Sequence, residues 1–179
     1  MQLLVPNEVL ASVRDIDIEA LKHQNIRGLL IDLDNTLVDW DKSEIDPSLA
    51  EWVKDVLRKG MAVCLVSNAV PKRVEQFSQQ LGIPGVSRAL KPLPRAFRIG
   101  LKKLGLRPHE AAVVGDQIFT DVFGGNRLGL YTILINPLST RELRSTRFMR
   151  RLERRVLKRM VQRGLMTDTA LKIRGRRSN

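Results

Sequence analysis

The sequence has very little cysteine and histidine, which excludes several kinds of site. Its only cysteine, Cys64, lies inside an apolar run, and its two histidines are His23 and His109. One cysteine cannot form a disulfide framework, and so few cysteine and histidine side chains give little support for a structural zinc site. We therefore expect a protein of the reducing cytosol.

Long apolar stretches and aromatic residues are also scarce. No apolar run approaches the ~20 residues that a membrane-spanning helix needs. The opening Met-Gln-Leu-Leu-Val-Pro-Asn-Glu lacks the basic and apolar regions of a signal peptide. Aromatic residues make up 4% of the chain, so no stacking platform for single-stranded nucleic acid is visible. We expect any contact with a membrane to be peripheral.

Acidic residues are missing mainly from the end of the chain. The 179 residues include 31 Lys or Arg and 19 Asp or Glu, a formal net charge of +12. Residues 1–140 hold 17 basic and 16 acidic side chains, a net of +1, whereas residues 141–179 hold 14 and 3, a net of +11. We therefore expect one domain at 1–140, with a helical lead-in, followed by a basic tail at 141–179.

Short apolar runs alternate with segments of helical period. The runs lie at 28–33, 61–66, 86–90, 111–114 and 130–135, the third being the weakest. The helical segments lie at about 47–59, 71–81, 93–104 and 119–128, and residues 7–25 predict one or two further short helices. This order is typical of an α/β fold with a mostly parallel sheet flanked by helices.

Polar side chains follow four of these runs. In an open parallel sheet, ligands bind at the carboxyl ends of the strands, so we expect these side chains to meet. Two carboxylates at i and i+2 leave a strand on the same side, which suits a divalent cation and the roles of nucleophile and acid or base. Each pattern alone also fits a turn, a helix cap or a solvated lysine. The patterns are Asp32-Leu33-Asp34-Asn35-Thr36, Ser67-Asn68, Lys91-Pro92 and Gly115-Asp116 with Asp121.

In this order, the four patterns resemble the haloacid dehalogenase (HAD) superfamily of phosphohydrolases. Trp40-Asp41, the segment 115–126 and the basic run 150–155 further resemble its YqeG branch in class IIIA, which is related to phosphatidylglycerophosphate phosphatases. The resemblance covers nearly the whole chain. It implies a Rossmann-like fold and a Mg²⁺-dependent phosphatase that works through an aspartyl phosphate.

The resemblance also implies a role for each residue. Asp32 is the nucleophile, and Asp34 is the acid in the first step and the base in the second. Mg²⁺ is held by Asp32, Asp116 and the backbone carbonyl of Asp34, while Asp121 contacts a metal-bound water, positions Lys91 or only caps a helix. Lys91 offsets the negative charge. Thr36 is also expected to steer Asp34. The phosphate is expected to bind at Ser67, at Thr36 and at the backbone amides around Leu33, Asp34 and Asn68.

The chain has no room for the cap domain that many members of this superfamily insert. Only residues 40–46 separate the first motif from the next helix, and 23 residues separate Asn68 from Pro92. An open site suits a phosphate on a large or surface-bound molecule, or a small substrate enclosed by a partner subunit. We expect Trp40 at the rim of the site or packed against its own loop.

The tail contains an amphipathic helix with a strongly basic face. Such a helix lies in an anionic membrane interface, docks its apolar stripe on the protein, or follows nucleic-acid phosphates. Residues 172–179 are expected to be disordered. The basic face is formed by Arg150, Arg151, Arg154, Arg155 and Lys158.

The resemblance favours a phospholipid substrate over the other partners. The expected function is hydrolysis of phosphatidylglycerophosphate to phosphatidylglycerol at the inner face of a membrane. The alternatives are a phosphatase of soluble phosphomonoesters or nucleic-acid ends, and a nucleic-acid or ribosome-associated protein with a vestigial site. The complete set of Asp32, Asp34, Ser67, Lys91 and Asp116 argues against a vestigial site.

Overall fold

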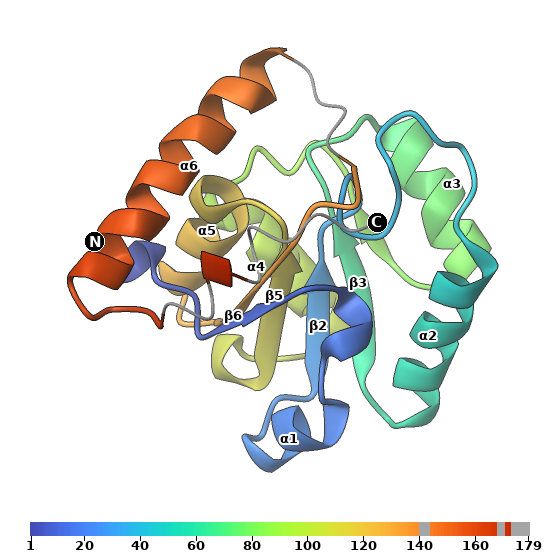
Figure 1. The fold of residues 1–179 in the computed structure, drawn as a ribbon. Coiled ribbons are helices and arrows are strands. Elements are labelled where there is room, and N and C mark those ends of the chain that lie inside the picture. Colours follow the sequence, from blue (N-terminus) through green and yellow to red (C-terminus); the bar gives the residue numbers. More distant parts are fainter. Residues whose placement is uncertain (140–143, 168–170, 173–179) are drawn as a thin grey trace.

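The computed structural model describes residues 1–139, 144–167 and 171–172. Its centre is a sheet of six strands in the order β1-β6-β5-β2-β3-β4, and every neighbouring pair is parallel (Figure 1). This confirms the expected α/β fold. The strands are β1 (Glu8–Leu10), β2 (Gly28–Ile31), β3 (Ala62–Val66), β4 (Gly85–Val86), β5 (Ala111–Gly115) and β6 (Tyr131–Ile135).

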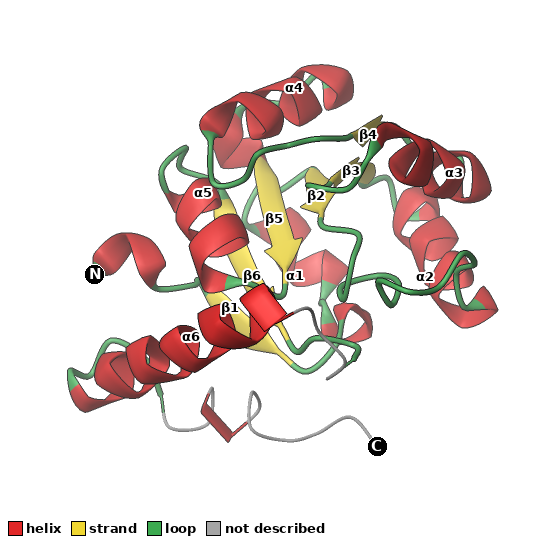
Figure 2. Cartoon of the chain, turned by 90° about the horizontal axis from the view of Figure 1, so that it is seen from above, coloured by secondary structure: helices red, strands yellow, loops and turns green. Residues whose placement is uncertain are grey.

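Helices cover both faces of the sheet (Figure 2). One face carries α1 (Ile18–His23), α2 (Pro47–Arg58) and α3 (Pro71–Leu81), and the other carries α4 (Pro94–Leu104), α5 (Phe123–Asn126) and α6 (Arg144–Gln162). Short helical turns complete the chain: η1 (Gln2–Leu4), η2 (Val13–Asp15), η3 (Pro108–Glu110) and the π-helix η4 (Ile118–Val122).

Helices α2, α3 and α4 begin and end close to where the local sequence predicts. Pro47, Pro71 and Pro94 occupy the first helical turn, where the missing N–H is not needed. Gly82 and Gly105 follow α3 and α4 with φ of 66° and 67°, a left-handed conformation that glycine adopts without strain. These signals place the polar strand ends next to helix starts, at one edge of the sheet.

The central strands are buried on both faces, because helices pack on each side. Along β2, Leu29 and Ile31 belong to the core beneath α2 and α3, whereas Leu30 belongs to the core beneath α4. A strand covered twice needs apolar side chains at every position. This is why the sequence shows continuous apolar runs at these strands rather than alternating apolar and polar residues.

The start of the chain differs from the prediction of helices alone. Residues 8–10 form the edge strand β1, which pairs with residues 133–135. The segments 13–15 and 18–23 are helical as expected. A three-residue strand has too short a pattern to be recognised locally, and its pairing partner lies far away in the sequence.

Two other predicted elements differ in extent. Of the run at 86–90, only Val86 belongs to the sheet, in β4 (Gly85–Val86), since Arg88 and Leu90 have positive φ angles that cannot continue a strand. The helix expected at 119–128 is instead η4 followed by the short α5. Both departures lie beside the polar strand ends.

The C-terminal helix packs on the domain. Leu157 and Met160 of α6 are buried against Ile118, Val122 and Leu134, and α6 lies next to α5 in Figures 1 and 2. The expected boundary near residue 140 and most of the expected disordered tail fall outside the described residues. Within the described ranges, no helix is long and apolar enough to cross a membrane.

Candidate active site

Four loops meet at the carboxyl ends of β2, β3, β4 and β5 and surround a pocket of about 300 Å³. Within the described residues no cap covers it: only residues 32–46 connect β2 to α2, and only residues 67–70 connect β3 to α3. The predicted groups therefore come together in an open site. The pocket is lined by Asp32, Asp34, Asn35, Trp40, Ser67, Asn68, Ala69, Lys91, Gln117 and Thr120.

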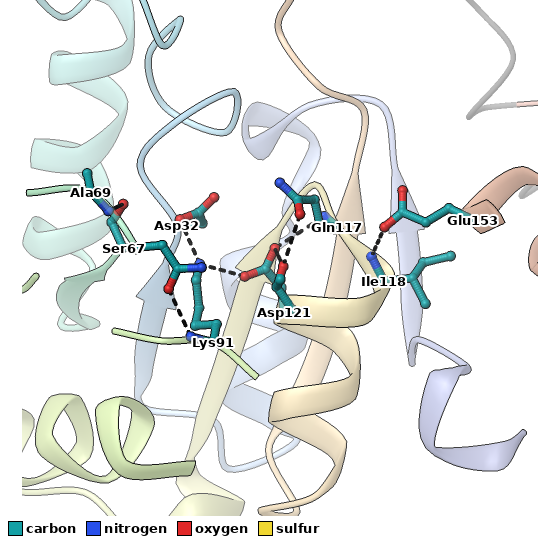
Figure 3. Close-up of polar contacts among 10 residues, drawn as sticks. Asp32, Ser67, Ala69, Lys91, Gln117, Ile118, Asp121 and Glu153 are labelled. Atoms are coloured by element: carbon teal, nitrogen blue, oxygen red, sulfur yellow. Dashed lines mark hydrogen bonds and ion pairs between the residues drawn. The ribbon is translucent and has the colours of Figure 1, made fainter. Parts of the chain in front are cut away.

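Lys91 joins two of the predicted acids. Its Nζ lies 2.6 Å from Oδ1 of Asp32 and 2.7 Å from Oδ1 of Asp121 (Figure 3). All three side chains are buried. The other carboxylate oxygen of Asp121 accepts hydrogen bonds from the backbone N–H of Gln117, at 3.2 Å, and from the hydroxyl of Thr120, at 3.3 Å. Of the three interpretations open for Asp121, this geometry favours the positioning of Lys91.

Glycine at position 115 makes this arrangement sterically feasible. A Cβ there would lie 2.2 Å from Cγ of Asp121, which is far too close. The residue that ends β5 must therefore lack a side chain if Asp121 is to fold back toward Lys91. The glycine of the Gly115-Asp116 pattern is explained by this close approach.

The buried charges shift one another's protonation equilibria. Burial raises the pKa of Asp32 to about 8, with Lys91 opposing the shift and the carboxylates of Asp121 and Asp116 adding to it. Burial works against the charged form of Lys91, but Asp121 and Asp32 outweigh it, so the pKa of Lys91 is raised. The lysine therefore stays an ammonium, and the surplus negative charge falls on the carboxylates.

The acid cluster fits a hard divalent cation. Oxygen atoms of Asp32, Asp116 and Asp121 lie within 4.8 Å of one another, and all three residues are buried. Three carboxylates facing one ammonium leave two surplus negative charges when all are ionised. Carboxylate oxygens are the ligands that Mg²⁺ and similar cations prefer. The donor set therefore supports a divalent metal site, with the side chain of Asp34 outside the cluster.

Asp34 is held by an arginine that the sequence analysis missed. Oδ1 of Asp34 accepts a hydrogen bond from Nε of Arg73 at 2.8 Å, and Nη2 of Arg73 forms an ion pair with the same oxygen at 2.8 Å. Arg73 also donates to the backbone carbonyls of Asp39, at 3.0 Å, and Lys42, at 2.7 Å, and its guanidinium lies 5.0 Å from the ring centre of Phe77. Arg73 thus fixes Asp34 and the loop after it to α3. Its position in the first turn of a helix at this edge was the only available signal.

The predicted phosphate-binding residues divide into two groups. Ser67 and Asn68 line the pocket: Oγ of Ser67 accepts from the Ala69 N–H at 3.1 Å, and Oδ1 of Asn68 accepts from the Lys91 N–H at 2.8 Å. The side chains of Leu33 and Thr36 are fully buried and do not line the pocket, so the role expected of the Leu33 backbone amide stays a prediction. The described contacts include no hydrogen bond between the Thr36 hydroxyl and Asp34, which pairs with Arg73 instead.

Three other pocket residues lie within or beside the sequence motifs but were not predicted to have a role of their own. Gln117 and Thr120 lie in the segment between Asp116 and Asp121, and Asn35 follows Asp34 with a φ of 62°. Trp40 lines the pocket and is 41% exposed. Its place at the rim is the first of the two positions expected for it.

A buried carboxylate of α6 also reaches this region. Oε1 of Glu153 accepts a hydrogen bond at 2.6 Å from the backbone N–H of Ile118, the first residue of η4 (Figure 3). The same loop carries Asp116, Gln117 and, one turn later, Asp121. The basic face of α6 remains on the outside, where Arg151, Arg154, Arg155 and Lys158 are exposed. The side chain of Arg150 lies outside the described part of the structure.

Comparison with known proteins finds a matching family and several relatives. Residues 15–129 match the model of the haloacid dehalogenase-like hydrolases. The chain is 40% identical to a probable phosphatase, YqeG, of Bacillus subtilis, over 91% of this chain and 95% of that protein. It is 33% identical to the chloroplastic and mitochondrial phosphatidylglycerophosphate phosphatase 1 of Arabidopsis thaliana, over 92% of this chain but only 50% of that longer protein.

A solved structure supports the same fold. An uncharacterised protein from Listeria monocytogenes superposes with a TM-score of 0.51 at 18% sequence identity, covering 66% of this chain and 85% of that one. At this identity, the likeness concerns the fold alone.

Proposed function

The chain belongs to the haloacid dehalogenase-like hydrolases and is a phosphatase, and from this premise we propose that it converts phosphatidylglycerophosphate to phosphatidylglycerol with Mg²⁺ as cofactor. The observation that carries the proposal is the open pocket, where Asp32, Asp34 and Lys91 meet without a cap above them. The Arabidopsis relative supports the choice of substrate, because its name gives this lipid phosphate.

The proposed chemistry divides between two carboxylates. In the first step, an oxygen of Asp32 bonds to phosphorus while the ester P–O bond breaks, and Asp34 gives a proton to the departing oxygen. In the second step, Asp34 takes a proton from water, whose oxygen bonds to phosphorus as the aspartyl P–O bond breaks. Inorganic phosphate leaves, and Asp32 is restored.

The surrounding residues bind and orient the phosphate. Lys91 supplies positive charge at 2.6 Å from Asp32, and Ser67 and Asn68 offer polar groups from the neighbouring loop. Arg73 fixes Asp34 next to the pocket. Phosphoryl transfer depends mainly on this kind of positioning and charge stabilisation.

The cation would be held by Asp32, Asp116 and the backbone carbonyl of Asp34, with Asp121 keeping Lys91 in place. When bound, Mg²⁺ supplies positive charge that offsets the phosphate and the clustered carboxylates. The buried triad of acids supports this assignment.

We further propose that the enzyme works at the inner face of an anionic membrane. The exposed basic side chains of α6 support this, because each Lys or Arg near such a surface contributes about 1 kcal/mol. The apolar side of α6 is occupied, since Leu157 and Met160 pack on the domain. The proposed contribution of this helix is therefore electrostatic.

Phosphate release tests the chemistry. We expect turnover with Mg²⁺, none with EDTA, and a loss of about 10³-fold or more in Asp32→Asn. Asp55→Asn, which changes a half-buried acid of α2 outside the pocket, is the matched control and should keep full activity. Intact turnover in Asp32→Asn would show that the nucleophile is wrongly assigned.

A substrate comparison tests the lipid. Phosphatidylglycerophosphate in mixed micelles should be hydrolysed faster than soluble phosphomonoesters and oligonucleotides phosphorylated at the 3' or 5' end. A preference for the soluble esters or the oligonucleotides would show that the proposed substrate is wrong and that the enzyme acts on the preferred class instead. The proposed phosphatase chemistry would be unaffected.

A further inference from the structure

The most exposed large apolar side chains in the described ranges belong to the loops that line the pocket, within two residues of a lining residue. Leu90, Val70 and Leu93 are 67%, 58% and 51% exposed, ahead of every other such residue. Val70 follows the pocket residue Ala69, and Leu90 precedes Lys91. Together with Trp40 on the pocket wall, these three residues form what we call the apolar rim. Apolar side chains gathered at one place on a surface mark an interaction site more often than scattered ones do.

The loops that carry the rim are tied together. The N–H of Arg88 donates to the carbonyl of Ala69, and the N–H of Ala89 donates to the carbonyl of Ser67, both at 3.0 Å. The N–H of Leu93 donates to the carbonyl of Leu90 at 2.9 Å. The exposed leucines are thus presented by ordered backbone that is shared with the phosphate-binding loop.

Basic residues flank Val70, Leu90 and Leu93, whereas Trp40 lies between Asp39 and Asp41. Lys72, Arg88 and Arg95 lie within two residues of a rim residue, and all three are exposed. Residues 76–109 contain seven basic side chains and no Asp or Glu. The net charge of +1 for residues 1–140 conceals this basic segment, because most of the Asp and Glu in that range lie before residue 76. The seven are Arg88, Lys91, Arg95, Arg98, Lys102, Lys103 and Arg107.

We propose that the apolar rim inserts into the surface of an anionic lipid bilayer and thereby holds the open pocket against the lipid head groups. Exposed apolar side chains flanked by Lys and Arg match an interface in which acyl chains lie beneath negative phosphates. A two-fold contact with a second copy is disfavoured, because it would bring these basic groups face to face. The inference rests on the proposed lipid substrate and adds the surface through which the site reaches it.

Vesicle binding tests the rim directly. The double variant Leu90→Gln/Leu93→Gln should bind vesicles of phosphatidylcholine and phosphatidylglycerol about tenfold or more weakly than the wild type in a flotation assay. The matched control is Leu3→Gln/Leu57→Gln, which removes leucines that are 46% and 37% exposed outside the pocket. We expect the control to bind as the wild type does. Equal binding by the rim variant would overturn the inference.

A fluorescent label gives a second measurement without removing much of the rim. Cys64 is the only cysteine and is buried, so Leu90→Cys can be labelled selectively with nitrobenzoxadiazole. We expect a blue shift of its emission on anionic vesicles and none for the same label at Leu57→Cys. A label at position 90 that stays in water on bound vesicles would contradict insertion.

Two activity measurements separate this inference from the proposed function. The ratio of hydrolysis of vesicle-borne phosphatidylglycerophosphate to that of p-nitrophenyl phosphate should fall about tenfold or more in the rim variant. If the wild type does not hydrolyse the lipid but the rim variant still loses vesicle binding, the substrate is wrong and the rim stands. If the lipid is hydrolysed equally by both proteins, the inference about the rim is wrong and the proposed substrate stands.

Self-association gives a further outcome. A rim variant that loses self-association on a sizing column, with unchanged vesicle binding, would assign the rim to a second copy and overturn the lipid inference.

Discussion

The buried charges around Lys91 and the exposed charges of α6 show how differently the same residue types behave in two regions. Lys91 is 8% exposed and lies within 2.7 Å of two carboxylates. Arg151, Arg154, Arg155 and Lys158 face solvent. The tail holds most of the net charge of the sequence, yet the charges that fix geometry lie in the part whose net charge is only +1. The net charge of the sequence therefore points to the basic surface of α6, whereas the buried charged side chains mark the candidate active site.

Removing Lys91 should give the largest effect on stability. Lys91→Met leaves the carboxylates of Asp32 and Asp121 buried without their cation, which should lower the free energy of unfolding of the metal-free protein by about 3–5 kcal/mol. Urea denaturation measures this change. Arg154→Met is the control, with an expected change within about 0.5 kcal/mol. Similar losses in the free energy of unfolding of the two variants would show that the buried and exposed cations contribute equally to stability, contrary to this prediction.

The raised pKa of Asp32 predicts how stability depends on pH. Between about pH 4 and pH 8, the folded protein keeps a proton on Asp32 that the unfolded chain has lost, because burial raises the pKa to about 8. The free energy of unfolding should therefore fall as pH rises through this window, by at most about 1.4 kcal/mol per unit. Asp32→Asn lacks the titrating group, so its curve should be flatter.

Urea denaturation of both proteins at a series of pH values, with EDTA present, checks this prediction. Parallel curves for the wild type and Asp32→Asn would contradict it. Added Mg²⁺ should raise the stability of the wild type most at the alkaline end, where the carboxylates are ionised and able to bind it.

The contact between Glu153 and Ile118 tests whether α6 is part of the active-site scaffold. Glu153→Gln weakens a buried hydrogen bond to a charged acceptor, and the expected loss of stability is about 1.5–3 kcal/mol. Turnover should fall as well, because the loop after β5 carries Asp116 and Asp121. Glu75→Gln, an exposed acid on α3, is the control and should change neither property. A stable, fully active Glu153→Gln would separate α6 from the site.

Single exposed arginines should give the smallest effects. Arg155→Ala should weaken binding to anionic vesicles by about 1 kcal/mol, roughly fivefold, and the difference should shrink as salt is raised. Flotation at two salt concentrations measures it. Loss of enzyme stability in this variant would show that Arg155 has a structural role like that of Lys91.

The parts of the fold that depend on local pattern could be predicted. The apolar runs of β2, β3, β5 and β6, and the helices α2, α3 and α4, follow from periodicity and from Pro and Gly at their ends. The edge strand β1 could not, because its three residues pair with residues 133–135. The positive φ of Arg88, two residues after β4, also depends on the neighbouring loop, because the Arg88 N–H donates to the carbonyl of Ala69.

The candidate site divides in the same way. The motif order marked Asp32, Lys91 and Asp116, since each follows a strand at one edge of the sheet. Arg73 and Glu153 escaped notice because an Arg or Glu in a helix usually faces solvent. Their contacts span 39 and 35 residues of sequence. Only the packing of α3 and α6 brings them to the site.

The sequence by itself determined the α/β class, the order of the polar strand ends and the basic character of the last helix, because these depend on residue type and spacing. Tertiary structure alone decided that Lys91 joins Asp32 to Asp121, that α6 docks its apolar side on the domain, and that Val70, Leu90 and Leu93 are exposed on loops that line the pocket. Local pattern fixes which face of an element is apolar. Which segments meet across that face is fixed by long-range packing.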